Sequence, residues 1–296
     1  MIAHQIMTNF KQDKIDVLDH VAVIVQDLSM SKGSFKRLGF CLTPVSQHSG
    51  ALTAGGEVVQ WGCANTCVML EQGYLELMGI IDENLYDNKI PEFLSRYEGI
   101  HIMAFGCQNP NSVSNRLSSS GFKSNGIYSL SRALDTPKGQ RTAKFELVRL
   151  PPGDMPEGRV LAIKHLTKDY LWQDRYMEHP NGALALEELV VSVEDLPTVA
   201  KRYTRYFGIK PVNKGGSWQF KLREGTFVLT TSRLLFENYE INAPSNPFAA
   251  IIKIKSRNLF KTRKILNQNS VKFKEIKNGI QVPGSEASGA TVIFIE

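Results

Sequence analysis

One four-residue phrase near the N-terminus carries the residue type best suited to chemistry. Leu18-Asp19-His20-Val21 opens an apolar, β-branched run, and the imidazole of His20 can bind a metal ion or transfer a proton. The phrase returns at Leu186-Glu187-Glu188-Leu189, where a carboxylate, that of Glu188, takes the place of the histidine. The two copies predict one chemical site in a chain built by repetition.

The cysteines give weaker evidence of a functional site than His20 does. The chain has 4 cysteines in 296 residues, too few and too irregular for a disulfide framework, so we expect them to be reduced. Cys63 and Cys67 have a spacing that suits a metal, but no second Cys or His pair follows at the distance typical of a zinc finger. We therefore expect no zinc finger.

The elements that must position His20 recur along the chain. Residues 16–25 are a predicted strand, a capped helix begins at residues 27–29, and Gly39-Phe40 ends it. The same series restarts at residues 100, 184 and 248, with Asn109 as the cap before the second helix, and further strand-like runs follow each helix. The predicted unit is β-α-β-β-β. Four such modules, paired into two domains with mixed, curved sheets around a cleft, make an α+β fold.

The domain boundary is predicted near residues 179–182. Residues 1–14 are expected to be a flexible lead-in, and residues 15–178 the first domain, with modules 15–98 and 99–178. Residues 183–296 are expected to be the second domain, with modules 183–244 and 245–296.

Composition and charge narrow the class of protein. No apolar run approaches the roughly 18–20 residues of a membrane span, and the N-terminus has no apolar secretion signal, so we expect a cytoplasmic protein that does not bind membranes. The net charge of +6 is local, because Lys and Arg concentrate in residues 253–277. Only Phe260 and Phe273 interleave them, which favours a solvated helix face over a nucleic-acid surface.

Several segments together resemble the vicinal oxygen chelate superfamily, specifically its glyoxalase-like domain proteins. They are the opening run 18–23, the strand 73–79 and the inter-domain stretch 165–183, and with the module plan they cover most of the chain. The superfamily spans lyases, dioxygenases, isomerases, resistance proteins and binders. The resemblance implies a tandem repeat, a small-molecule substrate and a divalent metal ion, and it leaves a homodimer open.

The resemblance also implies a ligand set, because in this superfamily the metal ligands come from the first and last strands of both modules of a domain. The matching positions are His20, Glu76 and His101, with His165 where a glyoxalase-type enzyme would hold Glu. Imidazoles with a carboxylate suit Zn, Ni, Fe(II), Mn or Co better than Mg or Ca. His48 shows no partner pattern.

Other side chains are candidate substrate contacts. Arg132 and Arg141 flank a turn-rich loop over the expected cleft and can hold an anionic substrate, unless they are simply exposed and solubilising. Asn65 can hydrogen-bond a ligand or cap a strand edge. Tyr74 and Trp172 can line an apolar pocket or belong to the core.

The expected function is a metal-dependent lyase or isomerase acting on a small carbonyl or hydroxy-carbonyl compound. The metal would stabilise an enediolate or oxyanion, and Glu76 or the residue at the fourth position would leave the metal to act as the catalytic base. An Fe(II)-dependent ring-cleaving or related dioxygenase is the enzymatic alternative. A non-catalytic protein that binds or sequesters a small molecule is the other class. With Glu188 and Glu296 as its only candidate ligands, the second domain is expected to have a degenerate site and a structural role.

Overall fold

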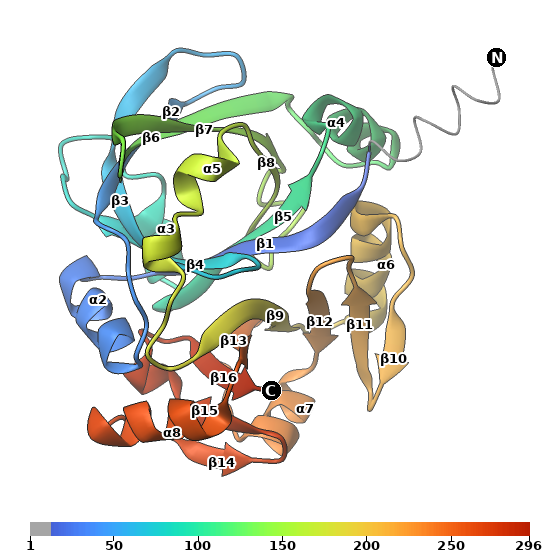
Figure 1. Ribbon diagram of the computed structural model, residues 1–296. Helices are drawn as coiled ribbons and strands as arrows, with labels where there is room; N and C mark the ends of the chain where they lie inside the picture. The colour runs from blue at the N-terminus through green and yellow to red at the C-terminus, as the bar shows by residue number, and fades with distance from the viewer. Residues whose placement is uncertain (1–12) are drawn as a thin grey trace, which may run out of the picture.

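Eight strands of the first half of the chain close into a barrel, which supplies the cleft that the module pattern requires. The computed structural model describes residues 13–296, so the expected lead-in at residues 1–14 lies almost wholly outside the described residues. The strands pair in the order β1-β4-β3-β2-β6-β7-β8-β5, and β5 pairs back to β1 (Figure 1). They are β1 (Ile15–Ile24), β2 (Ser46–Ala51), β3 (Val58–Met69), β4 (Tyr74–Ile80), β5 (Gly99–Cys107), β6 (Ile127–Thr136), β7 (Gly139–Arg149) and β8 (Arg159–His165).

Short helices surround this barrel and close its ends. Helices α2 (Leu28–Arg37) and α4 (Pro110–Ser119) start at the expected caps, where the side chains of Asp27 and Asn109 accept backbone N–H groups. Helix α5 (Lys168–Leu171), drawn across the ring of strands in Figure 1, contributes Leu171 to the barrel's inner apolar cluster. Helix α3 (Ile90–Leu94) contributes Ile90 to the same cluster. Both helices therefore pack against the interior of the barrel.

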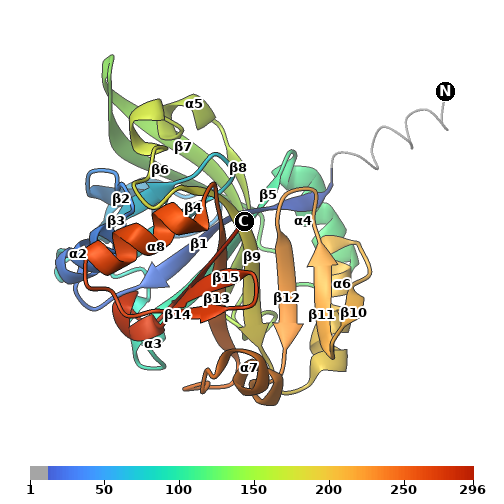
Figure 2. The same ribbon diagram turned by 60° about the horizontal axis from the view of Figure 1, so that its bottom comes forward.

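The second half forms an open, curved sheet in the order β14-β15-β16-β13-β9-β12-β11-β10 (Figure 2). It joins the barrel sheet through the pairing of Ala249 of β13 with Ile100 of β5. Two isolated bridges, Val17 with Glu224 and Gln72 with Ala185, also connect the two halves. Its elements are β9 (Ala183–Ser192), α6 (Leu196–Phe207), β10 (Val212–Lys214), β11 (Ser217–Lys221), β12 (Thr226–Thr230), α7 (Ser232–Tyr239), β13 (Phe248–Ser256), α8 (Leu259–Gln268), β14 (Lys274–Ile276), β15 (Gly279–Val282) and β16 (Thr291–Ile295).

Strand, helix and three strands follow one another from β1, β5, β9 and β13. In each series the last strand pairs in parallel with the first: β4 with β1, β8 with β5, β12 with β9 and β16 with β13. The sequence pattern missed β2 and β6, since neither reads as an apolar run. Their mutual pairing closes the barrel opposite β1 and β5.

The two halves share a hydrophobic core. Phe105, on the outer face of β5, packs edge-on against Phe207 of α6 at 4.8 Å and Phe227 of β12 at 5.6 Å between ring centroids. The inner face of the same strand, with Ile102 and Ala104, belongs to the separate cluster inside the barrel. Strand β5 therefore has one face toward the interior cavity and one toward the second half.

Candidate active site

Five polar side chains from five strands meet inside the barrel. They are His20 of β1, His48 of β2, Asn65 of β3, Glu76 of β4 and Arg132 of β6, and all are buried. All of them except Asn65 line, together with apolar neighbours, a cavity of about 50 Å³. Burying so many polar groups is costly unless they are paired, so the arrangement needs a specific reason.

Glu76 lies at the centre of this group. Its carboxylate oxygens are 3.4 Å from Nε2 of His48 and 3.9 Å from Nε2 of His20. Burial alone would raise the pKa of Glu76, but His48, His20 and Arg132 outweigh it and lower the pKa to about 2. Glu76 is therefore ionised at neutral pH.

His48 is the partner of this carboxylate. Burial alone would lower the pKa of His48, but Cys63 and the nearby charge of Glu76 raise it to about 9. Neither ring nitrogen of His48 has an aligned hydrogen-bond partner among residues 13–296, although both are buried. The ring thus has nitrogens available to a ligand or an ion.

A second carboxylate orients His20. The Nδ1–H of His20 donates to Asp19 at 2.7 Å, which leaves Nε2 facing the cavity and Glu76. The Nε2–H of His165 donates to the same carboxylate at 3.0 Å. Burial would raise the pKa of Asp19, but His165 and His20 hold it below its ordinary value. Tyr74 stacks on the His20 ring, 4.3 Å between centroids.

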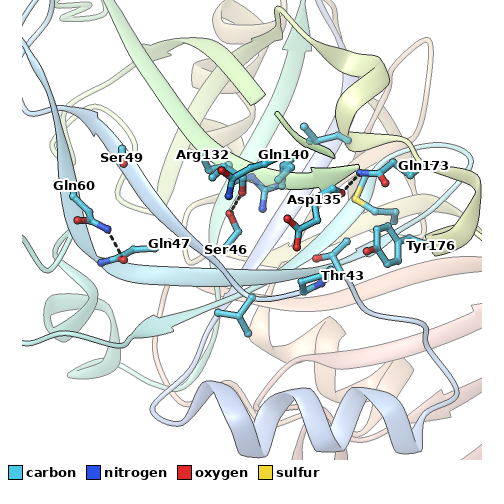
Figure 3. A pocket seen from close by; sticks show the side chains of 16 residues that line it. Thr43, Ser46, Gln47, Ser49, Gln60, Arg132, Asp135, Gln140, Gln173 and Tyr176 are labelled. Carbon is cyan, nitrogen blue, oxygen red and sulfur yellow. Dashed lines mark hydrogen bonds between the residues drawn. The ribbon is translucent and has the colours of Figure 1, made fainter. Parts of the chain in front are cut away.

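Asn65 and Arg132 hold the other side of Glu76. The Nδ2–H of Asn65 donates to Glu76, and the guanidinium of Arg132 donates to the Asn65 side-chain oxygen. Arg132 is also the residue common to the inner cavity and to a pocket of about 340 Å³ (Figure 3). That pocket lies at the barrel's end, where Ser46 donates to the Ala133 carbonyl. Arg132 therefore separates an outer pocket from the inner cavity.

The donor chemistry of His20, His48 and Glu76 fits a divalent transition metal. Two imidazoles and one carboxylate are a familiar set for such ions, and Asp19 behind His20 is the outer partner that a ligating histidine usually has. No hydrogen bond within residues 13–296 occupies the ring nitrogens of His48, and an ion bound there would displace the proton that the raised pKa of His48 retains at neutral pH. Among residues 13–296, no three His, Cys, Asp or Glu side chains already form a metal site, so these three must close on an ion to bind it.

His101 does not meet His20 and Glu76. It lies on the outer face of β5 with Met103 and Phe105, where its Nε2–H donates to the Tyr97 carbonyl at 2.7 Å. Its ring packs on Tyr97 and Phe93, at 4.0 and 5.1 Å between centroids.

The strand register explains the difference. Glu76 pairs with Ala22 in the first module, and Leu161 pairs with Ala104 in the second. The second-module counterparts of His20 and Glu76 are therefore Ile102 and Leu161, both apolar. His101 is one residue away from its expected slot, and one residue along a strand reverses the face.

Of the other expected site residues, His165 and Trp172 contact residues of the site, whereas Arg141 lies away from it. His165 stands behind Asp19 rather than beside Glu76, and Trp172 packs edge-on against Tyr74 at 5.8 Å between centroids. Arg141 is exposed and bonds the carbonyl of its neighbour Gln140, away from the cavity. Of the two arginines expected to contact substrate, the structure brings only Arg132 to the site.

The two candidate ligands of the second half, Glu188 and Glu296, make contacts within the fold. Glu188 forms an ion pair with Lys253 at 2.5 Å, and this pairing raises the pKa of Lys253 against the opposite effect of burial. Glu296 accepts the backbone N–H of Leu259 at the start of α8. Both carboxylates thus have partners within the fold.

Comparisons with known structures agree with this architecture. A hypothetical protein from Staphylococcus aureus superposes with a TM-score of 0.62 at 12% identity, covering 93% of this chain and 97% of that one. A mutant of 4-hydroxymandelate synthase from Streptomyces coelicolor superposes with a TM-score of 0.58 at 12% identity, covering 95% and 92%. At this identity the likeness shows the fold alone.

A third similar structure is a xylose isomerase-like TIM barrel/4-hydroxyphenylpyruvate dioxygenase fusion protein, at TM-score 0.58 and 12% identity. The match covers 96% of this chain and 50% of the fusion. No curated protein matches the chain by sequence. None of the helices within residues 13–296 is long and apolar enough to cross a membrane.

The family described as glyoxalase-like domain matches residues 18–207, more than half of the chain. The matched region contains every residue of the inner polar cluster and all of the barrel except the start of β1, residues 15–17. The chain belongs to the glyoxalase-like domain family, of the vicinal oxygen chelate type.

Proposed function

We propose that this protein is a metal-dependent lyase or isomerase that acts on a small carbonyl or hydroxy-carbonyl compound inside the barrel. The convergence of His20, His48 and Glu76 on one buried cavity is the observation that supports it. These three residues would hold a divalent ion, which when bound polarises a substrate carbonyl.

Glu76 is the candidate catalytic base, and its carboxylate would leave the ion to accept the proton. It is the one carboxylate among the described residues that line the inner cavity, and it is ionised at neutral pH. Asn65 and Arg132 fix its orientation through hydrogen bonds, and Asp19 fixes the tautomer of His20. These three are positioning residues. The apolar walls of the cavity keep water from the transferred proton.

Elemental analysis of the purified full chain tests the proposal. We expect a stoichiometric divalent transition metal in the wild type and its loss in His48→Ala and Glu76→Gln. His101→Phe is the matched control, because His101 is equally buried but lies on the other face of its strand. Loss of metal in His101→Phe with retention in His48→Ala would instead support the ligand set expected from the sequence.

The donor set also favours a second candidate, an Fe(II)-dependent dioxygenase, because two histidines and one carboxylate are the ligands typical of such enzymes. Stoichiometric iron together with substrate-dependent oxygen uptake would select this candidate. Zinc or nickel without oxygen uptake would select the lyase or isomerase. A chain that takes up no metal at all would leave the non-catalytic binding protein.

A further inference from the structure

Two more arginines line the inner cavity, at a distance from His20 and Glu76. Arg149 ends β7 and Arg159 begins β8, and both share the inward faces of their strands with the cavity wall. Following the register around the barrel, Arg159 lies beside Ile102, Ile102 beside Ala22, and Ala22 beside Glu76. Three strand spacings place the Arg159 and Glu76 backbones at most about 14 Å apart along the wall.

Neither of these arginines has an acidic partner. Among residues 13–296, no Asp or Glu forms an ion pair with Arg149 or Arg159 within 4.0 Å. Arg159 donates to the side-chain and backbone oxygens of Asn88, at 2.8 and 2.9 Å. The Nε–H of Arg149 is buried with no hydrogen-bond partner within these residues, and its guanidinium lies 5.0 Å from the Tyr128 ring centroid.

The two charges also act on each other. Burial and the neighbouring Arg149 lower the pKa of Arg159 to about 10, and burial lowers the pKa of Arg149. Both side chains are partly buried, and neighbouring like charges in such surroundings without a contacting counter-ion are unfavourable. Asn88 neutralises neither of them, since it carries no charge. The charge of Glu92 raises the pKa of Arg159 from beyond contact distance, so the pair has the composition of an anion site and no carboxylate of residues 13–296 in contact with it.

We propose that Arg149 and Arg159 form a subsite for the carboxylate of a small organic acid, whose other end reaches His20, His48 and Glu76. The inference rests on the proposed function in taking the inner cavity as the substrate site. It narrows the substrate class to short carboxylic acids that carry a carbonyl or hydroxyl group away from the carboxylate.

The chemistry of the site matches this ligand. Guanidinium groups bind carboxylates and phosphates through paired N–H donors, and Arg149 has an unused donor. A carboxylate is favoured over a phosphate because the cavity of about 50 Å³ leaves room for few atoms. The walls between the two ends are apolar, with Leu147, Leu161 and Ile163, which suits a short hydrocarbon segment.

Calorimetric titration of the full chain with butyrate, its neutral isostere butyramide and inorganic phosphate, at constant ionic strength, tests the subsite. We expect butyrate to bind and butyramide not to bind. Arg149→Met and Arg159→Met should each weaken butyrate binding by about 10- to 100-fold, the usual effect of losing a charge-assisted contact. Arg141→Met, an exposed arginine on the same strand as Arg149, is the matched control and should bind like the wild type.

Folding of the variants is checked separately. Removing one of two like charges relieves repulsion, so Arg149→Met should keep or raise the melting temperature. Unchanged butyrate affinity in folded Arg149→Met, equal binding of butyramide, or an equal loss in Arg141→Met would each overturn the proposal. Phosphate binding through the same arginines in place of butyrate would overturn the carboxylate assignment and indicate a phosphate ester.

Metal content separates this inference from the proposed function. Arg149→Met should retain as much metal as the wild type. If the chain binds no metal but its butyrate affinity depends on Arg149 and Arg159, the proposed function fails and the subsite stands. If metal binds as expected and butyrate does not, the subsite alone fails.

Discussion

The pH dependence of the free energy of unfolding should report on His101, which is fully buried on the outer face of β5. Burial lowers the pKa of His101 from 6.5 to about 4, despite the opposing effect of its hydrogen bond to the Tyr97 carbonyl. The unfolded chain takes up a proton near pH 6.5, whereas the folded protein resists protonation until about pH 4. His101 therefore contributes no penalty above pH 6.5 and destabilises the fold progressively as the pH falls toward 4.

The size of the effect follows from the two pKa values. The folded protein should lose about 2 kcal/mol at pH 5 and about 3 kcal/mol in the limit below pH 4 through this one group. His101→Phe removes the titration and keeps a ring between Phe93 and Tyr97. It also removes the hydrogen bond to Tyr97, at about 1 kcal/mol that does not vary with pH.

Urea unfolding of both proteins at pH 7.5 and pH 5 measures the difference. Between these two values, the wild type should lose about 2 kcal/mol more than His101→Phe, because all other titrating groups are common to both. An equal loss in the two proteins would refute the burial argument. A larger loss in the variant would show that the imidazole is charged and paired in the folded state.

Three further changes test the packing and backbone arguments. Asn181→Ala should cost about 2–3 kcal/mol in urea unfolding, because the buried amide donates to the Leu38 carbonyl and accepts from the Ala183 N–H; a cost near zero would contradict this. Gly208→Ala should cost about 1 kcal/mol by the same measurement, because Gly208 ends α6 with a left-handed φ of +74° that Ala adopts less readily. No cost would show that residue 208 has an ordinary helical φ instead. Phe105→Ala should cost about 3–5 kcal/mol and leave one calorimetric transition, because Phe105 packs the two halves together; two separated transitions in the wild type would contradict a shared core.

Local patterns in the sequence predicted much of the site-bearing fold. Alternation in residues 18–24 and 74–78 placed His20 and Glu76 on inward faces, and the caps at Asp27 and Asn109 marked the helix starts. These features depend on neighbouring residues in the chain. Their physical causes, strand pleating and helix capping, can therefore be read without knowing the tertiary contacts.

The remaining site residues depend on pairing between distant strands. His48 lies in a polar stretch, Ser46–Ala51, that becomes a strand only by bonding to β3 and β6. The resemblance places His101 at the ligand position on the opening strand of the second module, but the register of β5 against β1 places Ile102 inside. A stretch of polar residues with a single histidine shows neither apolar alternation nor a helix cap. The position of His48 in the site therefore emerges only from the structure.

The metal content of His48→Ala, measured beside that of His101→Phe, tests the central claim most directly. If His20, His48 and Glu76 form the site, His48→Ala loses the metal and His101→Phe retains the wild-type amount. Retention of metal by folded His48→Ala, or a wild-type chain that takes up no divalent metal, would contradict the account.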